Sequence, residues 1–215
     1  MTLRAELQAH LQSELDDPAI AQALVDIVCQ DVLSWQAPVV AVDKITAIVA
    51  FTFGNRMLPN GNRKPGPVNE ALADIVAALH QTTGARIFAQ WEIAAALHDR
   101  VPRDFVTTIN PTRDSRGEPV YLSTSGVLEA IAHKVSPPSL GSVGVVAFAD
   151  HIYRCVATAR RLGFNAYAAA GIAMPAAYVT ESGQAWCRDR LAYLLHDIMI
   201  RVTERRANLV GTMWR

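Results

Sequence analysis

The chain has 215 residues, 51% of them apolar, and its 20 basic side chains balance 20 acidic ones. This length favours one domain with a core of ordinary size. Zero formal net charge excludes a global electrostatic field that would attract nucleic acid or an anionic membrane surface. We therefore expect neither as a partner, and an anionic ligand would have to be bound by local groups.

The cysteines and the amino terminus favour a soluble, cytoplasmic protein. Cys29, Cys155 and Cys187 lie far apart and form neither a Cys-x-x-Cys pair nor a disulfide framework, so we expect reduced thiols and no metal site. Residues 1–15 are amphipathic and contain acidic side chains, unlike a signal peptide. No apolar run reaches the roughly 18 to 20 residues that a membrane span needs.

The first third of the chain predicts helices, a strand and a long loop. Apolar residues recur at helical spacing within residues 3–36, and Asp16 or Asp17 can cap a helix that starts at Pro18. The apolar, β-branched run at 45–51 is typical of a strand that is covered on both faces. Residues 53–67 hold so many glycines, prolines and asparagines that we expect an irregular loop, and loops of this length are usually functional.

Strands and helices then alternate. We expect strands at 85–90, 104–109, 143–149 and 165–169, and helices at 68–79, 91–97, from Ser123 through Val135, from Asp150 to about Leu162, and at 183–206. This order predicts an α/β fold, a Rossmann-like doubly wound sheet of about five mainly parallel strands with helices on both faces. Residues 1–36 would form a helical segment packed on a domain of residues 37–215.

The best candidate for a ligand site is the segment from Asp150 to Arg154, at the start of a helix directly after the most apolar strand. In such sheets, ligands bind beyond the carboxyl ends of strands. Free backbone amides, the His151 imidazole and the Arg154 guanidinium could all bind an anion there. Helical phasing directs Cys155 and its apolar neighbours to the core and turns His151 and Arg154 to another face. Alternatively, Asp150 only caps the helix and Arg154 pairs with a surface carboxylate.

The segment after the first strand supplies further candidate ligand-binding residues, Gly54, Asn55 and Arg56. A glycine allows the backbone to approach a ligand closely, and Arg56 could be a second anion clamp. A plain turn with a solvated arginine explains the same residues equally well. The chain has no P-loop, no Gly-x-Gly-x-x-Gly and no Gly-x-Ser-x-Gly motif.

Two other predicted helices begin with polar residues that are candidates for a ligand or catalytic site. Gln90 and Trp91 could bind a ligand, and Glu92 could act as a general base or bind a hydroxyl or an amine. Glu92 could equally be a first-turn acid that favours the helix dipole. Ser123 and Thr124 could bind a phosphate or a hydroxyl, although capping of the helix alone accounts for such residues.

From about Ile45 to Val202 the chain resembles the DUF218 or YdcF-like family. The strand at 143–149, then Asp150-His151, Arg154 and Arg160-Arg161-Leu162-Gly163, is similar to that family's strand, His-x-x-Arg and arginine-then-glycine helix end. Further similar positions are Tyr178, Ser182, Trp186, and Glu118 followed by Ser123-Thr124. Two places differ, because Gln90-Trp91-Glu92 replaces a glycine-glycine turn and Asn69 replaces an arginine. The resemblance implies a Rossmann-like fold and a nucleotide-like or phosphate-bearing ligand, with S-adenosylmethionine as one option.

These observations lead to two main hypotheses. In the first, the protein is an enzyme, a transferase or hydrolase, in which Arg56 and Arg154 hold a small anionic ligand and His151 and Glu92 are the catalytic acid and base. In the second, it is a binding or sensing domain that holds a nucleotide or S-adenosylmethionine without converting it. The amino-terminal helices also suggest a homodimer.

Overall fold

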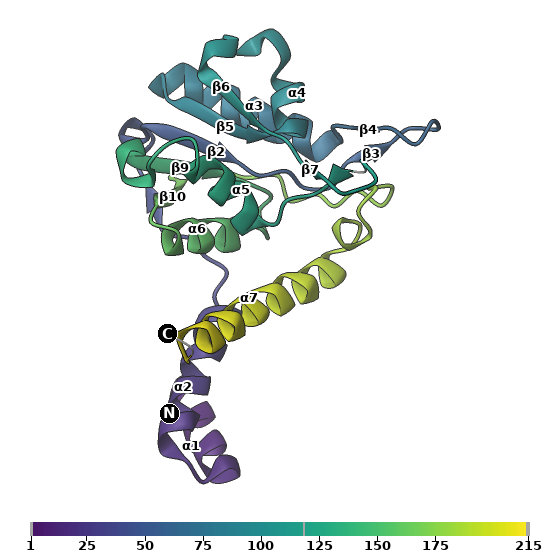
Figure 1. Cartoon of the computed structure of the whole chain (residues 1–215). Helices are drawn as coiled ribbons and strands as arrows, with labels where there is room; N and C mark the ends of the chain where they lie inside the picture. The colour runs from purple at the N-terminus through teal and green to yellow at the C-terminus, as the bar shows by residue number, and fades with distance from the viewer. Residues whose placement is uncertain (1, 118, 214–215) are drawn as a thin grey trace. The chain divides into compact units, whose positions relative to one another are not determined.

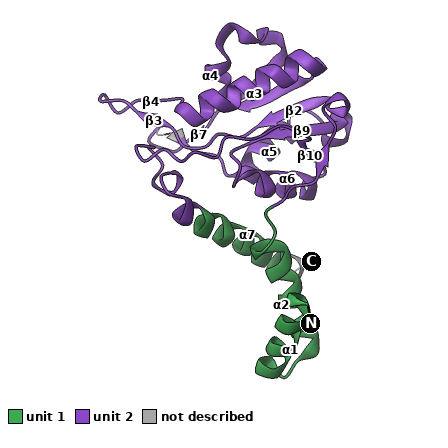
Figure 2. Ribbon diagram, turned by 180° about the vertical axis from the view of Figure 1, so that it is seen from behind, with its two compact units in different colours: residues 1–35, 194–215 green, residues 36–193 purple. Residues whose placement is uncertain are grey.

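The computed structural model describes residues 2–117 and 119–213, so Glu118, which contributes to the family resemblance, lies outside the described residues. The chain divides into two compact units (Figure 2). Residues 36–193 form one unit, and the two ends of the chain, 1–35 and 194–215, form the other. None of the described helices is long and apolar enough to cross a membrane.

The larger unit is built on a six-stranded sheet in which every pairing is parallel, which confirms the predicted α/β architecture (Figure 1). The strand order is β1-β10-β9-β2-β5-β6. The strands are β1 (Val39–Val40), β2 (Ala47–Ala50), β5 (Arg86–Gln90), β6 (Val106–Ile109), β9 (Ser142–Val146) and β10 (Asn165–Ala169). The chain proceeds outward from β2 through β5 to β6 and then returns to β9 on the other side of β2, so the strand order reverses between β2 and β9.

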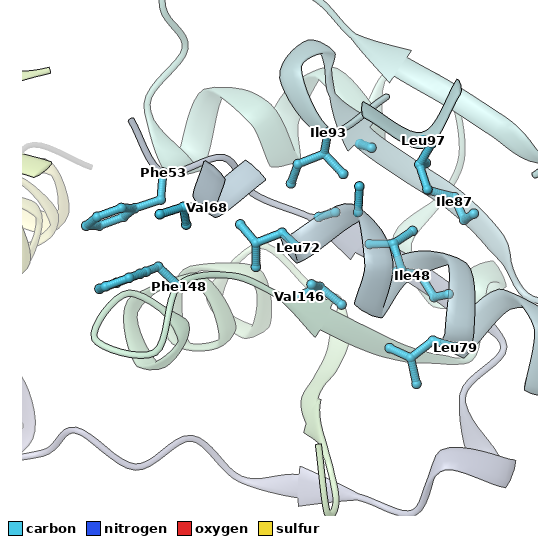
Figure 3. Close-up of a cluster of buried hydrophobic side chains, with 14 of the residues drawn as sticks. Ile48, Phe53, Val68, Leu72, Leu79, Ile87, Ile93, Leu97, Val146 and Phe148 are labelled. Atoms are coloured by element: carbon cyan, nitrogen blue, oxygen red, sulfur yellow. The ribbon is translucent and has the colours of Figure 1, made fainter. Parts of the chain in front are cut away.

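Helices cover both faces of the sheet, as predicted (Figure 1). Helices α3 (Pro67–Thr83) and α4 (Trp91–Leu97) pack on one face, and α5 (Thr124–Ala132) and α6 (Ile152–Arg161) on the other. Side chains of β2 alternate between the two cores, since Ile48 packs with α3 and α4 while Val49 packs with α5 and α6. Figure 3 shows the first of these cores, where Leu72 lies among strand residues and Phe53 faces Phe148.

The smaller unit contains α1 (Leu3–Leu15), α2 (Pro18–Ile27) and most of α7 (Arg190–Met213). The Asp17 carboxylate accepts hydrogen bonds from the first backbone amides of α2, which confirms the predicted cap. Asp197 and Arg201 form a buried ion pair on α7, and the guanidinium lies 4.1 Å from the centre of the Trp35 ring. Packing of the amino-terminal segment on the larger unit, and a homodimer, stay predictions.

Several predicted boundaries are wrong. The loop at 53–67 contains the hairpin β3 (Arg56–Met57) and β4 (Arg63–Lys64), because the turn around Asn60-Gly61 allows its two arms to pair. A second hairpin, β7 (Thr112–Arg113) and β8 (Pro119–Val120), lies between the strand predicted at 104–109 and the helix predicted from Ser123, where no strand was expected. The last helix begins at Arg190 rather than at residue 183, and α6 begins at Ile152 rather than at Asp150, after a turn.

Candidate functional site

The reversal of strand order between β2 and β9 defines where a ligand is expected in this fold. The two strands pair from Ala47 with Val143 to Ala50 with Val146, so their carboxyl ends lie side by side. The segments that follow are residues 51–55 and 147–151, which contain the predicted site residues Gly54, Asn55, Asp150 and His151. The larger unit by itself therefore brings the two main candidate segments to one edge of the sheet.

Arg154 is buried beside this edge, with 7% of its surface exposed. Its Nη1 donates a hydrogen bond to the Thr124 hydroxyl over 2.8 Å, and its Nη2 donates a longer one to the Tyr193 hydroxyl over 3.4 Å. Two hydroxyls from helices far apart in the sequence thus contact the guanidinium. The alternative in which Arg154 pairs with a surface carboxylate stays a prediction.

His151 lies beside Arg154, and both contact Tyr193. The His151 ring is buried and meets the rings of Tyr193 and Phe51 edge-on, with centroids 6.1 and 6.2 Å apart. Cys155, four residues along α6, is fully buried in the core, as the phasing predicted. Helical periodicity thus correctly predicted the core position of Cys155, and Tyr193 contacts both His151, at the cap position, and Arg154, in the first turn of α6.

Asp150 does not cap α6. The residue at the cap position is His151, which makes no capping hydrogen bond with its side chain, because the turn that ends at His151 separates Asp150 from the helix. The Asp150 carboxylate accepts a hydrogen bond from the Tyr178 hydroxyl over 2.8 Å and two from the Arg190 guanidinium over 2.9 and 3.2 Å. Burial and the adjacent Asp150 charge raise the pKa of Tyr178, so the phenol stays protonated and donates.

Position 54 favours glycine because of its backbone conformation and because a neighbouring segment of the chain packs against it. Its φ of +68° favours glycine, and a Cβ atom there would lie 2.4 Å from the Ser182 Oγ. Its backbone N–H donates to the side chain of Gln184 over 3.2 Å. Asn69, fully buried in α3, accepts from the Phe53 N–H over 2.9 Å and donates to the Gly54 carbonyl over 2.8 Å. Hydrogen bonds with Gln184 and with Asn69 thereby fix the loop that follows β2.

Segment 172–189, between β10 and α7, closes over the ends of both central strands. The Pro175 carbonyl accepts from the Ala149 N–H, and the Gly183 N–H donates to the Asn55 carbonyl, each over 2.9 Å. The cavity between this segment and the β2 loop measures only about 10 Å³. Such a space is at the lower limit for one water molecule, so a ligand can enter there only if the segment moves.

Arg56 lies on the β3–β4 hairpin, where its nearest described ion-pair partner is Glu70, at 3.9 Å. Its side chain is 43% exposed. The joint role of Arg56 and Arg154 as a pair of anion clamps stays a prediction. The alternative of a solvated arginine describes this position better.

Gln90 and Trp91 have different surroundings at the end of β5. The side-chain Oε1 of Gln90 accepts from the Thr52 N–H over 2.9 Å and from the Thr52 hydroxyl over 3.2 Å, which connects the ends of two neighbouring strands. Trp91 is half-buried and lines a cavity of about 420 Å³ together with Asn110, Pro111 and Arg113. A larger cavity, about 520 Å³, lies between α4 and the edge strand β6 rather than between β2 and β9.

Glu92 is fully buried, and burial raises the pKa of its carboxyl group to about 7. Its own backbone N–H, the Tyr121 hydroxyl and the Arg63 guanidinium oppose this effect, in that order. Among the described residues, no group makes a hydrogen bond of normal geometry to either carboxyl oxygen. Burial argues against a simple first-turn acid, since that role requires no removal of the carboxylate from water.

The two residues at the start of α5 have separate roles. The Ser123 hydroxyl accepts a hydrogen bond from the Gly126 N–H over 3.1 Å, so Ser123 caps the helix. Thr124 is buried and holds Arg154. Capping therefore accounts for Ser123 but not for Thr124.

Among the described residues near the site, Cys187 is not a reactive thiol and no metal cluster is found. Burial raises the pKa of the Cys187 thiol to about 12, although the Gly54 N–H and the Arg154 guanidinium oppose this effect, so the thiol stays protonated. In residues 2–117 and 119–213, no group of three or more His, Cys, Asp or Glu side chains is arranged to hold a metal ion.

Sequence reasoning missed the residues that complete the site from distant segments. Tyr193 falls within the last predicted helix, and nothing in the local sequence indicates that its hydroxyl contacts Arg154. Tyr121, directly after β8, and Arg63, in β4, both act on the pKa of Glu92, and the sequence predicts neither of these strands. The sequence shows arginines in both hairpins, but no local pattern indicates which groups their side chains contact.

Comparison with known proteins leaves the family open: no family model, no curated protein and no solved structure matches this chain.

Proposed function

We propose that this protein binds a small anionic, phosphate-bearing molecule where the strand order reverses, and that His151 exchanges a proton with it. The observation that carries the proposal is the buried Arg154 guanidinium, oriented by Thr124 and Tyr193 directly beside His151. A positive charge held in a low-dielectric site attracts an anion far more strongly than the same charge in water.

The surroundings of Arg154 support a phosphate more than a simple carboxylate. Arg154 lies in the first turn of α6, where the positive end of the helix dipole also favours negative charge. A guanidinium can form two parallel hydrogen bonds with phosphate oxygens. Histidine is suited to proton exchange near neutral pH. The resemblance to the DUF218 or YdcF-like family and a cytoplasmic location belong to this proposal, and the three free cysteines agree with that location.

The test compares Arg154→Lys with Arg161→Lys, an exposed arginine on the same helix. Isothermal titration would measure the affinities of inorganic phosphate, a set of nucleotides and S-adenosylmethionine. We expect Arg154→Lys to weaken binding of the phosphate-bearing compounds about tenfold or more, because lysine cannot reproduce the bidentate contact. Arg161→Lys should bind as the wild type does. Equal affinities in the two variants would remove Arg154 from the proposed site.

A second measurement addresses the chemistry. A compound that binds is incubated with the wild type and with His151→Asn, and then recovered and analysed. Conversion by the wild type and not by His151→Asn supports proton exchange by His151. Recovery of the intact compound from both would leave only the binding function, which is the alternative hypothesis of a sensing domain.

A further inference from the structure

Glu92 is the most unusual polar group that the proposed anion site does not use. Its side chain is fully buried, and among the described residues no group makes a hydrogen bond of normal geometry to either carboxyl oxygen. The weaker contacts of its own backbone N–H and of the Tyr121 hydroxyl offset the cost of burial only in part. Leaving a buried acceptor unpaired is costly, and native proteins rarely do so without a functional reason. A group that donates hydrogen bonds to these oxygens would remove that cost.

The neighbours of Glu92 indicate which kind of donor fits. The Asn55 Nδ2 donates to the Tyr121 hydroxyl oxygen over 3.4 Å, which leaves the hydroxyl hydrogen to be directed at another acceptor. The Arg63 guanidinium lies 5.1 Å from the centre of the Tyr121 ring and acts electrostatically on Glu92. Tyr121 and Arg63 are the titratable or charged groups that act on Glu92 from neighbouring segments.

This arrangement selects against a cation and favours a hydroxyl group. Arg63 already supplies positive charge, so an ammonium group would be repelled. An amide N–H could donate to Glu92 but could not accept from Tyr121. A hydroxyl can donate to the carboxylate and accept from the phenol at the same time.

We propose that Glu92, Tyr121 and Arg63 form a second subsite that binds a hydroxyl group of an uncharged, polyol-like part of the ligand. Glu92 lies two residues beyond β5, which pairs with β2, so the subsite is at the same edge of the sheet as Arg154. The inference rests on the proposed function, since it concerns the remainder of the phosphate-bearing ligand. The substrate class is therefore a phosphorylated polyol or sugar.

Binding should change the protonation of Glu92. Since the pKa of the carboxyl group is about 7, it is partly protonated at neutral pH in the absence of ligand. A hydroxyl that donates to the carboxylate stabilises the ionised form, so a bound proton is released to solvent. Inorganic phosphate, which has no polyol part, would not occupy this subsite and should release no proton from Glu92.

The experiment titrates inorganic phosphate, glycerol 1-phosphate, glucose 6-phosphate and inositol 1-phosphate into wild type, Glu92→Gln and Glu129→Gln, in buffers of different protonation enthalpy. Glu129 is an exposed acid on α5 and serves as the matched control. In the wild type we expect at least one polyol phosphate to bind about tenfold tighter than inorganic phosphate and to release a proton near pH 7. Glu92→Gln should lose both effects and keep its affinity for inorganic phosphate, whereas Glu129→Gln should keep all three.

Tyr121→Phe provides a second test if Glu92→Gln does not fold. Without the phenol hydroxyl, the carboxylate loses a favourable neighbour, so proton release should move to higher pH. The inference is overturned if no polyol phosphate binds tighter than inorganic phosphate, or if the advantage and the proton release persist in Glu92→Gln. Failure of inorganic phosphate to bind in an Arg154-dependent way would instead contradict the proposed anion site, whatever Glu92 does.

Discussion

Two buried charged residues at the same edge of the sheet, Arg154 and Glu92, differ in how the protein satisfies them. Arg154 donates to the hydroxyls of Thr124 and Tyr193, whereas no described group makes a normal hydrogen bond to the carboxyl oxygens of Glu92. An arginine cannot lose its proton, so the fold must supply acceptors for it. A carboxyl group can become neutral instead, and the raised pKa of Glu92 is the result.

The charge of Arg154 is therefore fixed, whereas the charge of Glu92 varies with pH. Arg154 is positive at every pH at which the protein is folded, which suits the binding of a permanent anion. Glu92 changes charge near neutrality, which suits contact with a group whose hydrogen bonding changes during binding. Stability measurements can test this difference without any ligand.

The largest expected effect is the pH dependence of stability that Glu92 introduces. Its pKa is about 7 in the folded protein and close to the ordinary 4.5 in the unfolded chain, so the folded state retains a proton that the unfolded state loses. This contribution is fully present below about pH 4.5 and is lost as the pH rises through about 7, by about 3 kcal/mol in total. Glu92→Gln should remove it, so the variant should match the wild type at low pH and exceed its stability at pH 8.

Chemical denaturation at several pH values between 4.5 and 8 would measure this difference, with Glu129→Gln as the control that follows the wild type. If the wild type and Glu92→Gln gave parallel curves, the Glu92 carboxyl would have an ordinary pKa, and Glu92 would not be the variable charge.

A smaller effect on stability is expected from the hydrogen bond between Thr124 and the Arg154 guanidinium. Thr124→Val keeps the shape of the side chain but removes the acceptor of the 2.8 Å hydrogen bond from Arg154. Hydrogen bonds to charged groups contribute about 1.5 to 3 kcal/mol, so we expect a loss of about 2 kcal/mol in the free energy of unfolding. The loss should be the same at pH 5 and pH 8, because arginine does not titrate there.

Thr124→Ser retains the hydroxyl and should lose only the contribution of one buried methyl group, about 1 kcal/mol. If Thr124→Val were no less stable than Thr124→Ser, the hydroxyl would not be needed to hold Arg154.

The sequence predicted the position of Arg154 better than it predicted the surroundings of Glu92. Helical spacing in α6 was sufficient to direct Cys155 to the core and to place His151 and Arg154 together, since a single element decides that arrangement. The fold class followed from the alternation of strands and helices. The two-residue strand β1 was missed because only its pairing with β10 makes it a strand.

The surroundings of Glu92 could not be predicted in the same way. Tyr121 and Arg63, which act on its carboxyl group, come from the residue directly after β8 and from β4, more than fifty residues apart. The sequence predicts no strand in either hairpin, because each of their strands is only two residues long. A first-turn glutamate has the same sequence pattern whether it is exposed or buried, so only the tertiary structure distinguishes the two cases.

The smallest expected effect concerns the second hydroxyl at Arg154. Tyr193→Phe removes the acceptor of the 3.4 Å hydrogen bond but keeps a ring in contact with Phe53 and His151. Since this bond is long, we expect a loss of at most about 1 kcal/mol in the free energy of unfolding, measured by denaturation at pH 7. Tyr193→Leu, which also removes the buried ring, should lose more. If Tyr193→Phe destabilised the protein as much as Thr124→Val, both hydroxyls would hold Arg154 equally, and the guanidinium would be more tightly fixed than the two distances indicate.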